Sequence, residues 1–137
     1  MYITNDPAVA KIAADAGVDR IFIDMEVLGK AERQGGMDTV QSHHVPEDIA
    51  RVCAAIGDGT EIMARVNPLN SDSQAEIDAS IENGADVIML PMWRTADDLR
   101  QLVSMVDGRA KVMPLLETDT AADNLPEAGG GYPPHPR

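Results

Sequence analysis

The stretch EIMARV at residues 61–66 is followed by two similar apolar runs, DVIML at 86–90 and KVMPLL at 111–116. Each run is short and rich in aliphatic side chains, as expected for a strand that is buried on both faces. The runs begin at positions 61, 86 and 111, a constant spacing that accommodates one strand, one helix and two tight loops. The repeat therefore predicts a parallel sheet with helices between its strands.

The same pattern extends toward the N-terminus. RIFID at 20–24 predicts another buried strand, and residues 1–4 predict a weaker one. Helical patterns fill the gaps, and each has a proline or polar start and a glycine near its end, as helix capping requires. They cover residues 7–16, 46–56, 73–83 and 95–106.

Two folds satisfy this repeat, an open doubly wound sheet and a (β/α)8 barrel. No glycine-rich phosphate loop follows the first two strands, which argues against a nucleotide-binding open sheet. Distinctive residues stand at or just past the carboxyl ends of successive strands, and these ends form the active-site face of a barrel. They are Asp24, Glu26, Arg65, Asn67, Pro91, Trp93 and Glu117. We predict an α/β fold, a partial (β/α)8 TIM barrel with strands one to five, as a single domain over 1–125.

Composition excludes several classes of function. The 137 residues carry a formal net charge of −12, which disfavours binding to nucleic acid or to an anionic membrane. The apolar runs are too short to span a membrane, and no secretory signal is recognisable. The single cysteine, Cys53, lies in an apolar helical pattern that predicts a buried, reduced thiol. These features predict a cytoplasmic protein.

Glu117 is a candidate metal ligand, because it ends the apolar run KVMPLL and a strand end would hold its carboxylate at the barrel mouth. Carboxylate oxygens suit Mg²⁺ or Mn²⁺. The alternative is an acid that stabilises the N-terminus of the next helix. Asp24 and Glu26 would point the same way from one strand, and two carboxylates on one face require a cation or a shared proton.

Arg65 lies among apolar neighbours in MARVNP, so an anion must meet its guanidinium. A carboxylate or keto acid fits the planar fork of an arginine, whereas a structural ion pair with Asp24, Glu26 or Glu117 is the alternative. The long connection from 27 to 44 contains His43 and His44 and predicts a functional lid or a disordered segment.

Four segments in order, FIDMEVLGKAERQ, MARVNP, NGADVIMLPM and KVMPLLET, resemble the HpcH/HpaI aldolase and citrate lyase family over roughly residues 1–125. The resemblance implies a divalent metal that polarises the carbonyl of a 2-oxo acid or an acyl thioester. It implies that Glu117 binds the metal, that Arg65 holds the substrate, and that Asp24 and Glu26 lie beside the metal. Asn67 and Pro91 are expected to contact the substrate with Arg65.

The sequence also departs from the family pattern. Aldolases of the family commonly have a histidine after the IDxE glutamate and an aspartate at the end of the third helix, and this chain has Val27 and Asn83 there. This departure favours a citrate-lyase-like or uncharacterised branch of the family, with a different base, over the hydroxy-acid aldolase mechanism. His43 or His44 could supply the missing base. The segment PEAGGGYPPHPR at 126–137 stands where the family has a sixth strand with a second metal-binding aspartate, and it predicts a disordered or frame-shifted tail.

These observations predict a Mg²⁺- or Mn²⁺-dependent carbon–carbon lyase, present here as an incomplete fragment and homo-oligomeric in its complete form. Its substrate would be a small 2-oxo acid or an acyl-CoA-type thioester. Two alternatives remain. One is an inactive fragment that serves only in subunit association, and the other is a phosphate-binding barrel enzyme, whose phosphate site would normally follow strands seven and eight.

Overall fold

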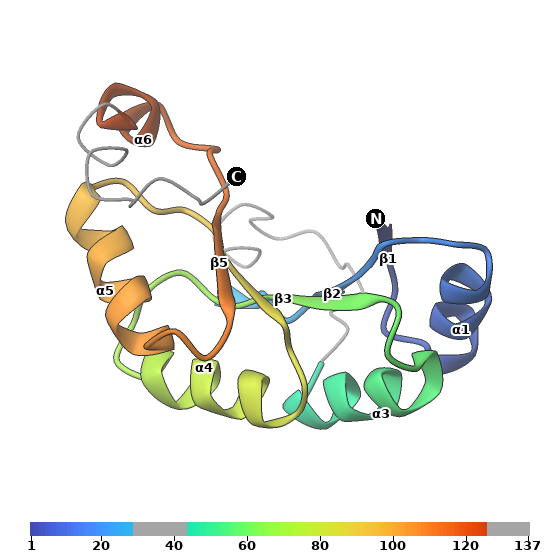
Figure 1. Ribbon diagram of the computed structural model, residues 1–137. Coiled ribbons are helices and arrows are strands. Elements are labelled where there is room, and N and C mark those ends of the chain that lie inside the picture. Colours follow the sequence, from blue (N-terminus) through green and yellow to red (C-terminus); the bar gives the residue numbers. More distant parts are fainter. Residues whose placement is uncertain (29–43, 126–137) are drawn as a thin grey trace, which may run out of the picture.

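The computed structural model describes residues 1–28 and 44–125, which form one parallel sheet in the order β1-β2-β3-β4-β5 (Figure 1). The strands are β1 (Tyr2–Ile3), β2 (Arg20–Asp24), β3 (Glu61–Arg65), β4 (Val87–Leu90) and β5 (Lys111–Pro114). The helices are α1 (Pro7–Asp15), α3 (Pro46–Ile56), α4 (Ser73–Glu82), α5 (Ala96–Val106) and α6 (Asp119–Asp123). The strand–helix repeat predicted from the sequence is confirmed.

The sheet is curved, and α1, α3, α4 and α5 cover its outer, convex side (Figure 1). Alternate strand residues therefore face different surroundings. Those on the convex side pack against the helices in the main core, to which the strands contribute Ile21, Ile23, Ile62, Ala64, Ile88 and Leu90. Those on the concave side form a second cluster of Phe22, Met63, Val87 and Met89. Burial on both faces explains why the strands are continuous apolar runs.

Capping chemistry sets the helix boundaries. The Asp6 carboxylate accepts hydrogen bonds from the backbone N–H groups of Ala8 (2.8 Å) and Val9 (3.2 Å), which begins α1. Thr95 and Asp98 form a reciprocal capping box at the start of α5. At the end of α1, Gly17 has a φ of 87°, which glycine adopts without a side-chain penalty.

One buried-residue prediction is wrong. Cys53 lies on α3 and is exposed, although its neighbour Val52 is fully buried. The apolar periodicity of α3 correctly places Ile49 and Val52 in the core, but Cys53 stands at the margin of that face, where its Sγ lies beside Gly84. A helical pattern alone does not separate the centre of an apolar stripe from its edge.

No helix in the described part of the chain is long and apolar enough to cross a membrane. The tail predicted for 126–137, and His43 with most of the 27–44 connection, lie outside the described residues.

Candidate functional site at the mouth of the sheet

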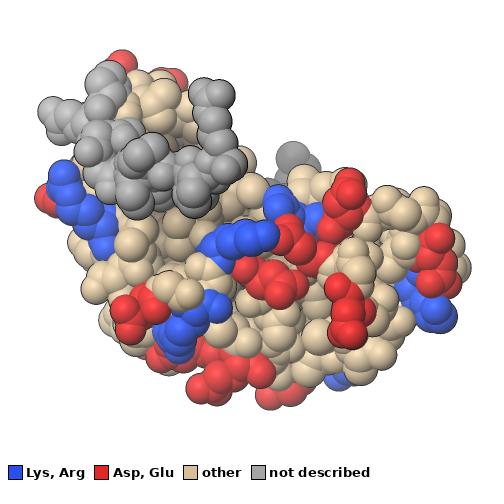
Figure 2. Space-filling model, viewed as in Figure 1, with Lys and Arg blue, Asp and Glu red and all other residues tan. Residues whose placement is uncertain are grey.

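The carboxyl ends of β2, β3 and β5 bring four charged residues to the concave face. Asp24 ends β2 and is paired in register with Arg65, which ends β3. Glu26 follows β2, and Glu117 follows β5. We call this group, Asp24, Glu26, Arg65 and Glu117, the mouth. Figure 2 shows acidic and basic side chains side by side on the face of the molecule that is turned to the viewer.

Arg65 is the centre of the mouth. Its Nε donates to Asp24 Oδ1 (3.0 Å) and its Nη2 donates to Asp24 Oδ2 (2.8 Å), a bidentate pair. Glu26 Oε2 lies 3.3 Å from Nε, and the guanidinium carbon stands 5.5 Å from the centre of the Phe22 ring. These contacts fix the orientation of the fork.

The mouth is largely shielded from water. The side chains of Arg65 and Asp24 are 17% and 16% exposed, and that of Glu26 is 0% exposed. Hydrogen bonding to Asp24 is the main cause that raises the pKa of Arg65, and the negative charges of Asp24, Glu26 and Glu117 act in the same direction. Glu117 is therefore close enough to Arg65 to act on it electrostatically.

The guanidinium keeps part of its fork available. The contacts above use Nε and Nη2, and the Nη1 N–H groups donate no hydrogen bond within residues 1–28 and 44–125. The sequence left two interpretations of Arg65 open, a structural ion pair and a substrate-binding residue, and the structure is compatible with both. The ion pair with Asp24 and Glu26 is present, and donors remain that suit a substrate anion.

Glu117 connects two loops of the mouth. Its Oε1 accepts a hydrogen bond from the backbone N–H of Met92 (2.9 Å), in the loop after β4. Thr118 Oγ1 donates to the carbonyl oxygen of Trp93 (2.9 Å) in the same loop and also begins α6, the helix that the alternative role of Glu117 assumed but for which no bounds were predicted. The Thr118 hydroxyl before an aspartate was a capping signal that could have revealed α6.

Asn67 links the loop after Glu26 to helix α4 through hydrogen bonds. Its Oδ1 accepts hydrogen bonds from the backbone N–H groups of Val27 (2.8 Å) and Leu28 (2.9 Å), directly after Glu26. Its own N–H and Nδ2 donate to Oε1 of Glu76 on α4 (3.0 and 2.9 Å). Glu76 is a residue that the sequence did not single out. These bonds use most of the capacity of the Asn67 side chain.

The remaining candidates are less central. Pro91 is buried beside the mouth in the loop after β4. His44 Nδ1 lies 3.5 Å from Asp48 Oδ2 at the start of α3. Asn83 donates from Nδ2 to the carbonyl oxygen of Ala79 (2.8 Å) at the end of α4, which leads into the opposite end of the sheet from the mouth. Asn83 therefore lies far from Arg65 within one chain.

The described residues provide some of the ligands that a metal site needs, but not a complete set. Within residues 1–28 and 44–125, no three His, Cys, Asp or Glu side chains stand close enough to hold an ion by themselves. The mouth nevertheless carries three carboxylates and one guanidinium, so its charge is compatible with a divalent cation. Mg²⁺ is commonly held by one or two carboxylates, with water and substrate completing its coordination.

Comparison with known proteins identifies the family of the chain. Residues 1–127 match the family model of the HpcH/HpaI aldolase/citrate lyase family. The chain belongs to this family. Among solved structures, an HpcH/HpaI aldolase from Desulfitobacterium hafniense DCB-2 has a similar fold, with a TM-score of 0.68 and 16% sequence identity. At that identity the likeness concerns the HpcH/HpaI fold alone.

The alignment with this aldolase covers 93% of the chain and 56% of the solved structure, so the chain spans about half the length of that protein. Its five parallel strands and helices correspond to part of a TIM-barrel-like aldolase, as the sequence predicted. A search of curated proteins found no match.

Proposed function

We propose that this chain provides the substrate-orienting part of a divalent-metal-dependent carbon–carbon lyase that acts on a 2-oxo acid or an acyl thioester. The observation that carries the proposal is the Arg65 fork, held by Asp24 and Glu26 at the mouth of a family barrel with Nη1 still available. A fixed guanidinium with remaining donors suits a substrate carboxylate.

Binding the substrate would use the Nη1 edge of Arg65. Because Asp24 is bonded to the other side of the fork, the guanidinium loses little conformational freedom when a second anion approaches. Glu26 and Asp24 keep Arg65 positively charged, so its attraction for a carboxylate is constant across the neutral pH range. Asn67, which holds the backbone after Glu26, would keep the acidic pair in place.

The HpcH/HpaI family is generally dependent on a divalent metal. In this chain Glu117 would hold the ion, Asp24 and Glu26 would hold water bound to it, and the ion would stabilise the negative charge that develops on the substrate carbonyl oxygen. Glu117 Oε1 is already oriented by the Met92 N–H. That bond would fix the carboxylate before a cation arrives.

The test combines binding and turnover. Calorimetric titration of the chain with pyruvate in the presence of Mg²⁺ should give saturable binding, and Arg65→Lys should weaken it by about 10- to 100-fold, or roughly 1.5–3 kcal/mol, through loss of the fork. The matched control is Arg100→Lys on α5, whose side chain is 70% exposed and paired with Asp97. Release of pyruvate from 4-hydroxy-2-oxopentanoate should show the same dependence.

Equal pyruvate affinity in the Arg65→Lys and Arg100→Lys variants would contradict the assignment of Arg65. Binding or turnover that is indifferent to Mg²⁺ would contradict the metal-dependent mechanism.

A further inference from the structure

A pocket of ≈ 360 Å³ lies beside the mouth, between the segments that follow β2, β3 and β4. Most of its wall is apolar, with a polar rim that includes Arg94 and Asp98. The apolar wall includes Leu28, Leu69, Leu90, Pro91, Met92 and Trp93. The pocket therefore combines a wall suited to hydrocarbon with a few polar groups, the usual composition of a small-molecule site.

Two residues that line the pocket connect it to the mouth by backbone hydrogen bonds. Leu28 lines the pocket, and its backbone N–H donates to Asn67 Oδ1 two residues after Glu26. Met92 also lines the pocket, and its backbone N–H donates to Glu117 Oε1. A ligand held by Arg65 and Glu117 would therefore have this pocket directly alongside.

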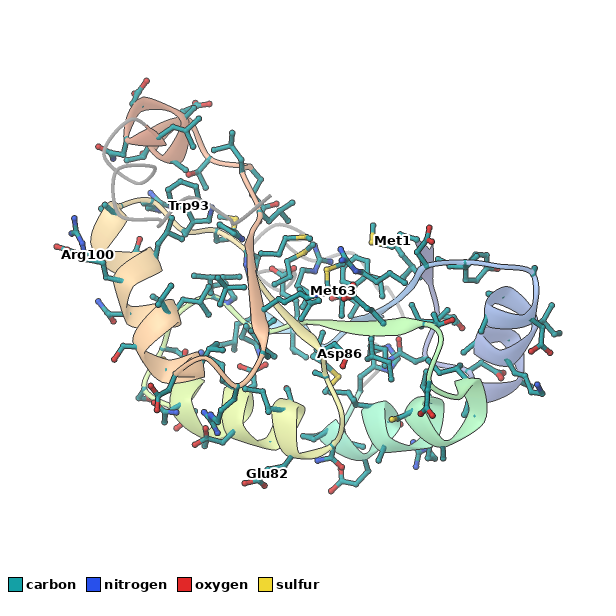
Figure 3. The ribbon with its side chains drawn as sticks, in the orientation of Figure 1. Met1, Met63, Glu82, Asp86, Trp93 and Arg100 are labelled. Atoms are coloured by element: carbon teal, nitrogen blue, oxygen red, sulfur yellow. The ribbon has the colours of Figure 1, made fainter. Side chains whose placement is uncertain are left out.

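Trp93 is a further notable residue of the pocket wall. It comes from the loop between β4 and α5 (Figure 3), lines the pocket, and is only 3% exposed. Its indole Nε1 is buried and has no hydrogen-bond acceptor in the part of the chain that the structure describes. A buried donor of this kind is costly unless it donates a hydrogen bond to an acceptor.

The backbone at the same loop is strained. Met92 has a φ of 54°, a left-handed conformation that is uncommon for a residue with a side chain. Such strain persists where the surrounding structure imposes it, and it concentrates at ligand-binding positions. Here it presents the Met92 N–H to Glu117.

We propose that this pocket receives a compact apolar group of the substrate, and that the substrate is a small 2-oxo acid with an aliphatic or small aromatic side chain rather than an acyl-CoA thioester. The inference rests on the proposed function for the 2-oxo acid group. Small-molecule pockets range over about 300–1,000 Å³, so this one suits a compact group. The net charge of −12 also disfavours a carrier with several phosphates.

Trp93 is the only tryptophan of the chain, so its fluorescence reports on this pocket directly. The 137-residue chain would be titrated in Mg²⁺ with 4-methyl-2-oxopentanoate, pyruvate and acetyl-CoA. We expect a saturable change in Trp93 emission, with a midpoint for 4-methyl-2-oxopentanoate at least tenfold lower than for the other two ligands. No saturable change, or an equal or lower midpoint for pyruvate or acetyl-CoA, would overturn the inference.

Variants locate the binding. Leu28→Glu places a charge in the pocket wall, and we expect it to raise the midpoint for 4-methyl-2-oxopentanoate at least tenfold. Val103→Glu on α5 is the matched control, because Val103 is 45% exposed and Leu28 is 52% exposed, and Val103 lies outside the pocket lining. Equal effects of the two substitutions would show that the ligand binds elsewhere and would overturn the proposal.

A further ligand separates this inference from the proposed function. If 4-methylpentanoate, which lacks the oxo group, binds as well as 4-methyl-2-oxopentanoate and Arg65→Lys changes neither midpoint, the oxo-acid role of the mouth fails while the apolar pocket stands. If pyruvate binding depends on Arg65 but Leu28→Glu has no effect on 4-methyl-2-oxopentanoate, the mouth stands and the pocket fails.

Discussion

The two ends of the concave face are both built from ion pairs, but their charge balance is opposite. At the amino ends of the strands, Glu61 accepts hydrogen bonds from Arg20 Nε (3.1 Å) and Nη2 (2.6 Å) and from Lys111 Nζ. We call these three residues the base. Two cations share one carboxylate there, so the carboxylate is fully paired.

The mouth has the reverse composition, with one guanidinium among the carboxylates of Asp24, Glu26 and Glu117. It is also better shielded, since Arg65 is 17% exposed whereas Glu61 is 31% exposed and Lys111 is 68% exposed. The same residue types therefore serve two purposes. The base is a paired, solvated cluster, and the mouth keeps an excess of negative charge and unused donors, which is where the proposed function places a cation and an anionic substrate.

The largest expected difference between the two ends is in stability. Arg65→Met should lower the free energy of unfolding by about 3–5 kcal/mol, because it leaves the shielded carboxylates of Asp24 and Glu26 without their cation. Glu61→Gln should cost less than about 1 kcal/mol, as for other solvated ion pairs. Urea denaturation of the chain at pH 7 measures both.

The control for Arg65→Met is Arg100→Met, which removes an exposed guanidinium from α5 on the outer side of the molecule (Figure 3). Comparable losses in Arg65→Met and Glu61→Gln would show that the mouth and the base are equally solvated, and the contrast between them would fail.

The second prediction concerns divalent cations. Glu117→Gln should weaken Mn²⁺ binding to the chain at least tenfold, about 1.4 kcal/mol, because an amide oxygen replaces a charged ligand. Glu61→Gln removes the same charge from the base and should leave Mn²⁺ affinity unchanged. Calorimetric titration compares the two variants. Loss of affinity in both would mean that overall charge, and not the mouth, attracts the ion.

The composition of the mouth could be predicted from the sequence, because the carboxyl ends of parallel strands lie at the same edge of a sheet. Asp24, Arg65 and Glu117 were placed together on that basis, and the structure brings them together. The bidentate Asp24–Arg65 pair was one of two alternatives, since sequence cannot tell an internal partner from a substrate.

Other features depend on register and could not be predicted. The base links Arg20, Glu61 and Lys111 across strands 41 and 50 residues apart, and only the pairing of β2 with β3 aligns Arg20 with Glu61. The Glu76–Asn67 contact likewise depends on how α4 packs behind β3. Asn67 was predicted to contact substrate, whereas its observed bonds hold the loop after Glu26.

The third prediction tests the contact between Glu76 and Asn67, next to the mouth. Burial raises the pKa of Glu76 above its ordinary value of 4.5, although hydrogen bonds from Asn67 oppose this. Because the folded pKa is the higher one, the protonated form stabilises the fold below pH 4.5, and stability falls as the pH rises through the folded pKa. Glu76→Gln should remove this loss and leave stability at pH 7 equal to or above that of the unmodified chain.

Urea midpoints at pH 4 and pH 7 measure the effect. Glu82→Gln is the matched control, an exposed glutamate on the same helix (Figure 3). If Glu82→Gln flattens the pH dependence as much as Glu76→Gln does, the burial of Glu76 is not the cause.

The smallest expected effect concerns the base. Hydrogen bonds from Lys111 first and Arg20 second lower the pKa of Glu61 below 4.5, so its stabilising contribution is present above that pH and is lost as the pH falls through the folded pKa. The pairs are solvated, so salt should screen them. The difference in urea midpoint between the unmodified chain and Glu61→Gln should therefore shrink between 0.01 M and 1 M NaCl, whereas the Arg65→Met difference should persist because water and ions reach the mouth less easily. Equal salt sensitivity at both ends would show that the mouth is as open to solvent as the base, and its proposed selectivity for one cation and one anionic substrate would then have no electrostatic foundation.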